Sequence, residues 1–186
     1  MPIKAFSSPE KFEDWLEKQH AKSNGIWLKF FKKASGKKTV VYKEALDVAL
    51  CYGWIDSQTR SLDAEAYLQK FTPRRTKSLW SQTNRGHIAR LIKEKRMRPP
   101  GLAEVARAKS DGRWDAAYAS SKVMQMTDDF AKALKQSPKA KKFYETLKRV
   151  NTYAIYWRIH TAKKPETRAK KITQIIEMLE AGKTFY

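Results

Sequence analysis

The sequence predicts an α+β protein, in which an antiparallel sheet with two helices is followed by a segment made only of helices. Three observations support this fold class. Stretches rich in aromatic residues, which are typical of strands, occur mainly before Pro73. Apolar residues after Pro73 recur at helical spacing, and proline and glycine mark most boundaries between segments. A hydrophobic content of 41% in 186 residues is enough for a packed core.

The first half is predicted to run helix, strand, helix, strand, strand. Ser8 suits an N-cap and Pro9 suits the first helical position, so the first helix should begin there. Gly53 is a suitable C-terminal stop for the second helix. The remaining predicted elements are a strand at residues 26–31, a turn at 34–38, a helix at 42–52, and strands at 54–60 and 66–72.

The second half is predicted to be helical from Ser78, which suits an N-cap. The run Pro99-Pro100-Gly101 is expected to break the chain before a short helix that ends near Gly112. These segments suggest an α+β domain at residues 1–76 and a helical segment at residues 77–186. Further helices are predicted at about 128–136, 138–149, 151–163 and 166–181, with Gly182 closing the last.

The net charge of +20 is concentrated in two short segments. Residues 69–98 hold ten Lys or Arg against one Asp or Glu, and residues 139–171 hold eleven against two, so each segment contributes +9. Such clusters attract polyanions and steer their approach. An alternative interpretation is that the basic residues only keep the protein soluble.

Cysteine and histidine give no sign of a metal or cofactor site. Cys51 is the only cysteine, so neither an intramolecular disulfide nor a thiolate zinc site is expected, which fits a reducing cytoplasm. No metal, cofactor or catalytic residue is predicted. The N-terminus lacks the apolar run of a signal peptide, and no stretch has the apolar length of a membrane span. Metal-ligand spacing is absent from the three histidines, which are His20, His87 and His160.

Several motifs extend over nearly the whole chain. They are Trp27-Leu-Lys-Phe-Phe-Lys-Lys33, Tyr42-Lys-Glu-Ala45, Ala49-Leu-Cys-Tyr-Gly-Trp-Ile-Asp56, Phe71-Thr-Pro-Arg74, Ser78-Leu-Trp-Ser81 with Asn84, Asp111-Gly-Arg-Trp114 with Ala117-Tyr118, and Ala162-Lys163 with Glu166-Thr-Arg168. In these motifs the chain resembles the YdeI/OmpD-associated family, also described as bacteriocin-protection-like. The resemblance implies a bacterial protein with a YjbR/CyaY-like, or frataxin-like, N-terminal half and a helical C-terminal part. It implies no catalytic residue. Lys93-Glu-Lys-Arg96 replaces a glycine-containing turn and suggests a slightly longer helix.

The segment after Pro73 is the first candidate site. If a helix starts at Ser78, its free N–H groups and partial positive charge would lie beside arginines that can bind a phosphate or carboxylate with two hydrogen bonds. Alternatively, Ser78 only caps the helix, Trp80 lies in the core, and Arg74 pairs with Asp56. The candidate ligand-binding residues in this segment are Arg74, Arg75, Lys77, Ser78, Ser81, Asn84 and Arg85.

A second basic turn, at residues 162–171, adds Lys163 and Arg168 to the candidate ligand-binding residues. The helix dipole disfavours cations at a helix start, so an anionic partner or an acid from elsewhere in the protein is expected nearby. Lys170 and Lys171 are better explained as a solvated basic face.

One predicted helix carries a stripe of rings beside basic residues. Such a stripe is typical of a core, although exposed rings between cations can stack the bases of single-stranded nucleic acid. In a separate tight turn, Arg113 is expected to pair with Asp111 or Asp115. The rings of the stripe belong to Tyr153, Tyr156, Trp157 and His160.

These features lead to three functional hypotheses. The first is a non-enzymatic cytoplasmic protein that binds a nucleic acid or a phosphorylated small molecule through the two basic segments. The second is an enzyme or a small-molecule sensor with a pocket at the junction of the two halves. The third is a stress-related module that binds another protein. The pocket of the second hypothesis would be lined by Asp56, Arg74, Ser78, Ser81 and Asn84.

Overall fold

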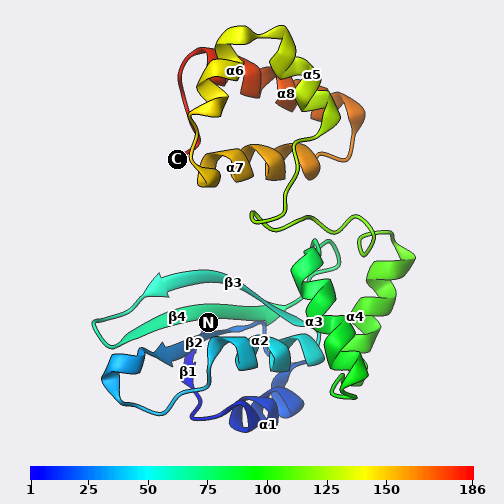
Figure 1. The fold of residues 1–186 in the computed structure, drawn as a ribbon. Helices are drawn as coiled ribbons and strands as arrows, with labels where there is room; N and C mark the ends of the chain where they lie inside the picture. Colours follow the sequence, from blue (N-terminus) through cyan, green and yellow to red (C-terminus); the bar gives the residue numbers. More distant parts are fainter. The chain divides into compact units, whose positions relative to one another are not determined.

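The computed structural model describes residues 1–186 and divides into two compact units. The sheet unit comprises Met1–Trp80 and Asn84–Ala117, and the helical unit comprises Ser81–Thr83 and Tyr118–Tyr186. Figure 1 labels the elements of both units. The α+β fold class is confirmed, and the two helices that directly follow the sheet group with it.

The sheet contains four strands, β1 (Ile3–Ala5), β2 (Ile26–Phe31), β3 (Trp54–Ser61) and β4 (Ala66–Pro73). Their order is β1-β2-β4-β3. β4 pairs antiparallel with both β2 and β3, which confirms the three predicted strands. The sequence does not predict β1, a short strand that pairs parallel to β2 and makes the sheet mixed. β3 contains a bulge between Asp56 and Thr59.

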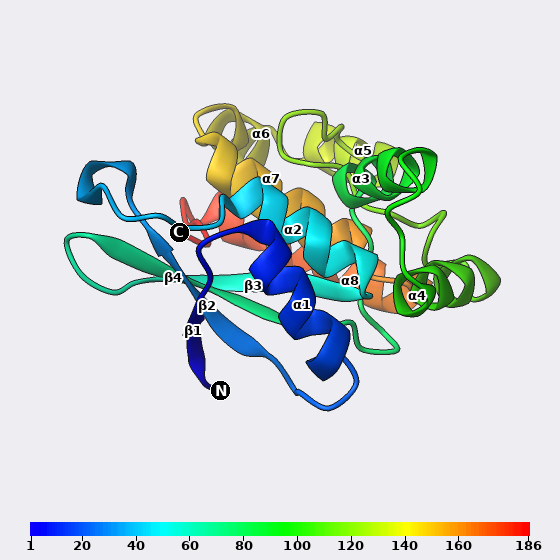
Figure 2. The same ribbon diagram turned by 90° about the horizontal axis from the view of Figure 1, so that it is seen from below.

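Helices α1 (Pro9–Gln19) and α2 (Tyr42–Cys51) lie side by side across one face of the sheet (Figure 2). The Ser8 hydroxyl accepts a hydrogen bond from the first turn of α1, which confirms the predicted N-cap. Aromatic contacts join the helices to the strands, as where Trp15 meets Trp54 edge to face with ring centroids 5.7 Å apart. The core of the sheet unit therefore lies between this face and the two helices.

The pleat of β2 determines which of its residues lie on the other face of the sheet, because successive side chains point to opposite sides. Three residues are fully buried beneath the helices: Ile26, Leu28 and Phe30. Three half-buried residues alternate with them: Trp27, Lys29 and Phe31. We call the side on which these three lie the open face. A 3₁₀ helix, η1 (Lys33–Ser35), follows β2 within the predicted turn.

The prediction that Ser78 starts a helix is wrong, because α3 (Gln82–Lys93) begins four residues later. The Ser78 hydroxyl accepts a hydrogen bond from the Arg75 N–H at 2.9 Å and closes a turn instead. Trp80 follows this turn and is fully buried. The hydrogen bond of this turn and the burial of the Trp80 indole thus take the place of the predicted helix start, and the helix begins only after them.

The predicted extension of this helix is also wrong. α3 ends at Lys93, and Lys95 takes a left-handed conformation with φ of 57°. The Arg96 N–H then donates to the carbonyl of Leu91 at 3.0 Å, which is the hydrogen bond of a Schellman ending. A lysine therefore occupies a backbone position that usually favours glycine.

Pro99-Pro100-Gly101 begins a helix, so the predicted break is wrong. Helix α4 (Pro99–Ser110) starts at Pro99, since the first turn of a helix tolerates residues without an N–H group. Gly101 packs directly against the backbone of Cys51 in α2. A glycine is needed here because any side chain would occupy the space of a backbone carbonyl.

The helical unit is built of α5 (Asp128–Gln136), α6 (Pro138–Glu145), α7 (Arg149–His160) and α8 (Pro165–Glu180), close to the predicted ranges. Gly182 has φ of 67° and follows the end of α8, as predicted. Asn151 exchanges two hydrogen bonds of 3.1 Å with the backbone of Tyr186 and so holds the C-terminal segment against α7. No helix of the protein combines the length and the apolar character that crossing a membrane requires.

The space around two glycines predicts opposite effects on stability when each is replaced by alanine, because Gly101 packs against α2 and Gly86 has no close neighbour. Gly101→Ala should lower the free energy of unfolding by about 2 kcal/mol, because its methyl group would overlap the Cys51 carbonyl. Gly86→Ala, in the interior of α3 with no atom near its added methyl group, should raise it by up to about 1 kcal/mol. Urea unfolding followed by circular dichroism measures both. Equal effects would show that α4 packs differently.

Candidate functional site

The first predicted ligand residue, Arg74, lies inside the sheet unit and is only 6% exposed. Its guanidinium carbon is 3.6 Å from the ring centroid of Trp80, and Nη1 donates to the carbonyl of Leu79 at 3.2 Å. Its backbone N–H donates to Gly53 at 3.0 Å. These contacts favour a structural role in which Arg74 holds the segment after β4 in place.

The neighbouring turn is bound to a second arginine. Arg113 is buried, pairs with Asp111 at 2.7 Å and donates to the carbonyl of Ser78 at 2.8 Å. The pairing of Arg113 with Asp111 confirms one of the two predicted partners. On the same turn, Arg75 and Lys77 are exposed. The turn therefore presents two cations to solvent, without the helix N-terminus that a phosphate site was expected to use.

The remaining residues of this candidate site occupy different surroundings. The Arg85 guanidinium lies 5.2 Å from the ring centroid of Trp114. Ser81 is buried and forms an isolated bridge with Tyr118 in the helical unit. Asn84 is half-buried and belongs to the sheet unit.

Asp56, a candidate for both an ion pair and a pocket, lies on the core side of β3. It accepts a hydrogen bond of 2.7 Å from the hydroxyl of Tyr42. Burial, followed by this contact with Asp56, raises the pKa of Tyr42 far above its usual value. The pair therefore ties α2 to β3 with a protonated tyrosine as the donor.

Arg168, the main residue of the second basic turn, pairs with an acid from elsewhere in the protein, which is one of the two alternatives that the sequence left open. Its Nε and Nη2 atoms contact the two carboxylate oxygens of Asp129 at 2.5 and 2.9 Å. Nη1 donates to the carbonyl of Ile159 at 2.7 Å. The hydrogen bonds from Arg168 hold the pKa of Asp129 well below its usual range. The exposed side chain of Lys163 has no such contact.

The aromatic stripe of α7 divides into structural and exposed members. The Tyr153 hydroxyl donates to the carbonyl of Ala119 at 3.3 Å, and the Tyr156 hydroxyl accepts from the Ala119 N–H at 3.0 Å. Trp157 is 41% exposed. Two of the rings therefore anchor the segment before α5, as the structural interpretation expects.

The open face of the sheet contains a constellation that the sequence analysis did not identify. The guanidinium carbon of Arg60 lies 4.5 Å from the ring centroid of Trp27, and Lys70 Nζ lies 5.9 Å from the same centroid. The three residues come from three neighbouring strands: β3 supplies Arg60, β2 supplies Trp27 and β4 supplies Lys70. Three strands thus bring one indole and two cations together.

A second ring on the open face repeats the arrangement. Lys29 Nζ lies 4.7 Å from the ring centroid of Phe31, and Lys37 Nζ lies 5.4 Å from it. Lys37 is also paired with Glu65 at 2.6 Å, at the rim of the sheet. We call Trp27, Phe31 and their four basic neighbours, which are Lys29, Lys37, Arg60 and Lys70, the aromatic–basic face.

The aromatic–basic face contains little negative charge. Asp56 is the one acidic residue in the four strands, and its pairing with Phe71 and its bond to Tyr42 place it on the core side. Cation–π contacts hold the basic groups over the rings, and of the four basic residues only Lys37 is paired with an acid, Glu65. The face can therefore offer flat apolar surface and positive charge to one ligand.

A signal for this face exists in the sequence. Trp27, Lys29 and Phe31 stand at i, i+2 and i+4 of a predicted strand, so they must share one side of it. The basic residues that complete the face come from other strands, and only the register of the sheet places them beside the rings.

Neither the cysteine thiol nor a cluster of metal ligands contributes to the site. Burial raises the pKa of the Cys51 thiol to about 11, so it is a poor nucleophile at neutral pH. No group of three or more His, Cys, Asp or Glu side chains is arranged to hold a metal ion.

Asp129→Asn should reduce stability at neutral pH by at most about 1 kcal/mol, since the ion pair with Arg168 is partly exposed. Because the folded-state pKa of Asp129 is depressed, the pair stabilises the fold above about pH 4 and this stabilisation is lost as the pH falls further. The difference from the wild type should therefore shrink in acid. Thermal unfolding from pH 7 to pH 3 measures it, with Asp128→Asn in the same helical turn as the control. Identical pH profiles for both variants would contradict the assignment.

Cys51 should react with a thiol reagent such as dithionitrobenzoate on the order of a hundredfold more slowly in the folded protein at pH 8 than in denaturant, because little thiolate is present. Absorbance stopped-flow measures both rates. Equal rates would show that the thiol is neither buried nor shifted.

Comparison with known proteins gives two family matches. Residues 4–104 match a domain of unknown function (DUF8412), and residues 123–182 match the family described as bacteriocin-protection, YdeI or OmpD-associated. Comparison with curated proteins and with solved structures gives no significant match. The first match covers most of β1, the other three strands, α1 to α3 and the first half of α4, and the second contains all four helices of the helical unit. The chain therefore belongs to the DUF8412 family, whose model covers more than half of it, and its helical unit matches the YdeI/OmpD-associated family that the sequence motifs resemble.

Proposed function

We propose that this protein is a cytoplasmic binding protein for single-stranded nucleic acid, whose bases stack on the aromatic–basic face of the sheet. The observation that carries the proposal is the placement of a cation within 6 Å of both open-face rings, with Arg60 at 4.5 Å from Trp27 and Lys29 at 4.7 Å from Phe31. A cytoplasmic location is consistent with the single unpaired cysteine.

Rings and cations have separate tasks in such binding. Every base has a π face, so aromatic side chains stack bases with little regard to sequence, while Lys and Arg neutralise the phosphates between them. A base that stacks on Trp27 would displace the Arg60 guanidinium toward the adjoining phosphate, so the same pair contributes both contacts. Four-stranded sheets of RNA-binding domains use surface aromatics in this way.

The spacing of the rings favours an extended polymer over a small phosphorylated molecule. Trp27 and Phe31 are four residues apart on one strand, which corresponds to roughly 13 Å. A compact phosphate would need converging donors, whereas Arg74 and Arg168 already donate to groups within the protein. Single strands are favoured over duplexes because paired bases do not expose their π faces.

Trp27→Leu should weaken binding of a fluorescein-labelled oligothymidylate of about 12 nucleotides by about tenfold or more, because stacking contributes about 1–3 kcal/mol per base. Fluorescence anisotropy at low salt measures the affinity. Trp157→Leu is the matched control, since it removes an exposed indole from α7. Absence of binding by the wild type at low salt, or equal losses for both variants, would contradict the proposal.

Arg60→Gln should reduce the slope of log affinity against log salt by about 0.7, the value for one phosphate contact on a single strand. Arg75→Gln removes the same charge from the exposed turn outside the sheet, so its slope should stay steeper than the slope measured for Arg60→Gln. The same titrations with a duplex of equal phosphate number test the preference for single strands. If Arg60 and Arg75 contribute equally, attraction by net charge alone explains the binding.

A further inference from the structure

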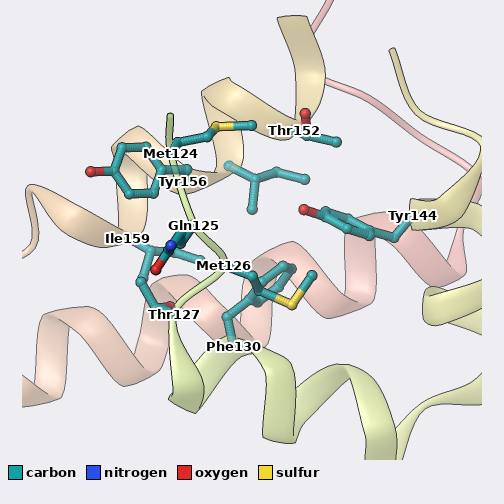
Figure 3. A pocket seen from close by; sticks show the side chains of 10 residues that line it. Met124, Gln125, Met126, Thr127, Phe130, Tyr144, Thr152, Tyr156 and Ile159 are labelled. Atoms are coloured by element: carbon teal, nitrogen blue, oxygen red, sulfur yellow. The ribbon is translucent and has the colours of Figure 1, made fainter. Parts of the chain in front are cut away.

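A cavity in the helical unit shares no residue with the aromatic–basic face and has no role in the proposed function. It has a volume of about 160 Å³ and lies between α5, α6, α7 and the segment that leads into α5 (Figure 3). Its ten lining residues are Met124, Gln125, Met126, Thr127, Phe130, Tyr144, Thr152, Ile155, Tyr156 and Ile159.

The size of the cavity limits its occupant to a small molecule. Protein interiors contain few voids larger than a water molecule, because close packing is favourable. A cavity of about 150 Å³ in another protein holds one benzene molecule. The present cavity, lined by Phe130, Ile155 and Ile159 on its inner side, is of the same size. One six-membered ring with a small substituent would therefore fit.

The lining also limits the charge of the occupant. None of the ten residues is charged, although 31% of the chain consists of Asp, Glu, Lys and Arg. An ion transferred into such a site would lose its hydration without gaining a partner of opposite charge. This excludes the anions that the rest of this basic protein would attract, and it favours a neutral molecule.

The hydroxyl group of Tyr144 is placed to orient the occupant. The Tyr144 side chain points its hydroxyl toward the cavity, and its ring packs edge to face against Phe130 with centroids 5.6 Å apart (Figure 3). Burial raises the pKa of Tyr144, so the group stays protonated and can donate. The other three lining hydroxyls belong to Tyr156, which accepts from the Ala119 N–H, to Thr152, which donates to the carbonyl of Arg149, and to Thr127, which contacts Asp129.

The wall toward solvent is formed by adaptable side chains. Met124 and Met126 belong to the segment before α5, and Met126 is exposed. Methionine side chains are flexible and polarisable, which lets them adjust to aromatic molecules of different shape. Entry past these residues would require no movement of a helix.

We propose that this cavity binds one small neutral aromatic molecule, which accepts a hydrogen bond from the hydroxyl of Tyr144. The proposal concerns the helical unit alone and does not depend on nucleic-acid binding by the sheet.

Three probes of similar size test the proposal: phenol, toluene and benzoate. Phenol should bind most tightly, toluene more weakly, and benzoate not measurably. Methyl NMR spectra should report the binding through shifts of Ile155, Ile159 and Met124. Equal binding of benzoate and phenol, shifts confined to other methyl groups, or no shift with phenol at millimolar concentration would each overturn the proposal.

Two variants separate the cavity from the general surface. Tyr144→Phe should weaken phenol binding on the order of fivefold and leave toluene binding unchanged, because it removes one hydrogen bond and keeps the ring. Met124→Phe, in a segment without helix or strand, should fill the mouth and weaken both. If Met124→Phe fails to fold, the comparison of phenol with toluene in Tyr144→Phe still decides. Equal losses for both probes in that variant would overturn the role of the hydroxyl.

Discussion

The alternation of side chains along β2 is the constraint on which the sheet unit depends. Burial of Ile26, Leu28 and Phe30 beneath α1 and α2 leaves the intervening residues no other side of the sheet to occupy. A shift of one residue in register would exchange the two sets and expose the core. The same hydrophobic burial that stabilises the unit therefore also positions Trp27 and Phe31 on the opposite face.

The elements of the fold were largely predictable because their signals are local. Pro9 after Ser8, the apolar alternation of β2 and the glycine after α8 each act within a few residues. The failures occur where tertiary contacts compete with local preference. Ser78 has the chemistry of an N-cap, yet a turn and the burial of Trp80 delay the helix to Gln82.

The candidate site was harder to predict than the fold, because charge density along a sequence does not show how each charge is used. The sequence left open whether Arg168 meets a ligand or an internal acid, and the fold places Asp129, 39 residues away, against it. Arg74 is consumed in a similar way by packing on Trp80. By contrast, Arg60 lies outside both highly charged segments, and only the pairing of β3 with β4 brings it to the rings of β2.

The bulge in β3 affects more than the path of one strand. β3 lies at the edge of the sheet, where unpaired backbone groups can recruit a strand from another molecule. A bulge twists such an edge and interrupts its regular hydrogen-bonding pattern, and Arg60 adds a charge beside it. The irregularity between Asp56 and Thr59 thus makes this edge a poorer template for pairing with a strand of another molecule.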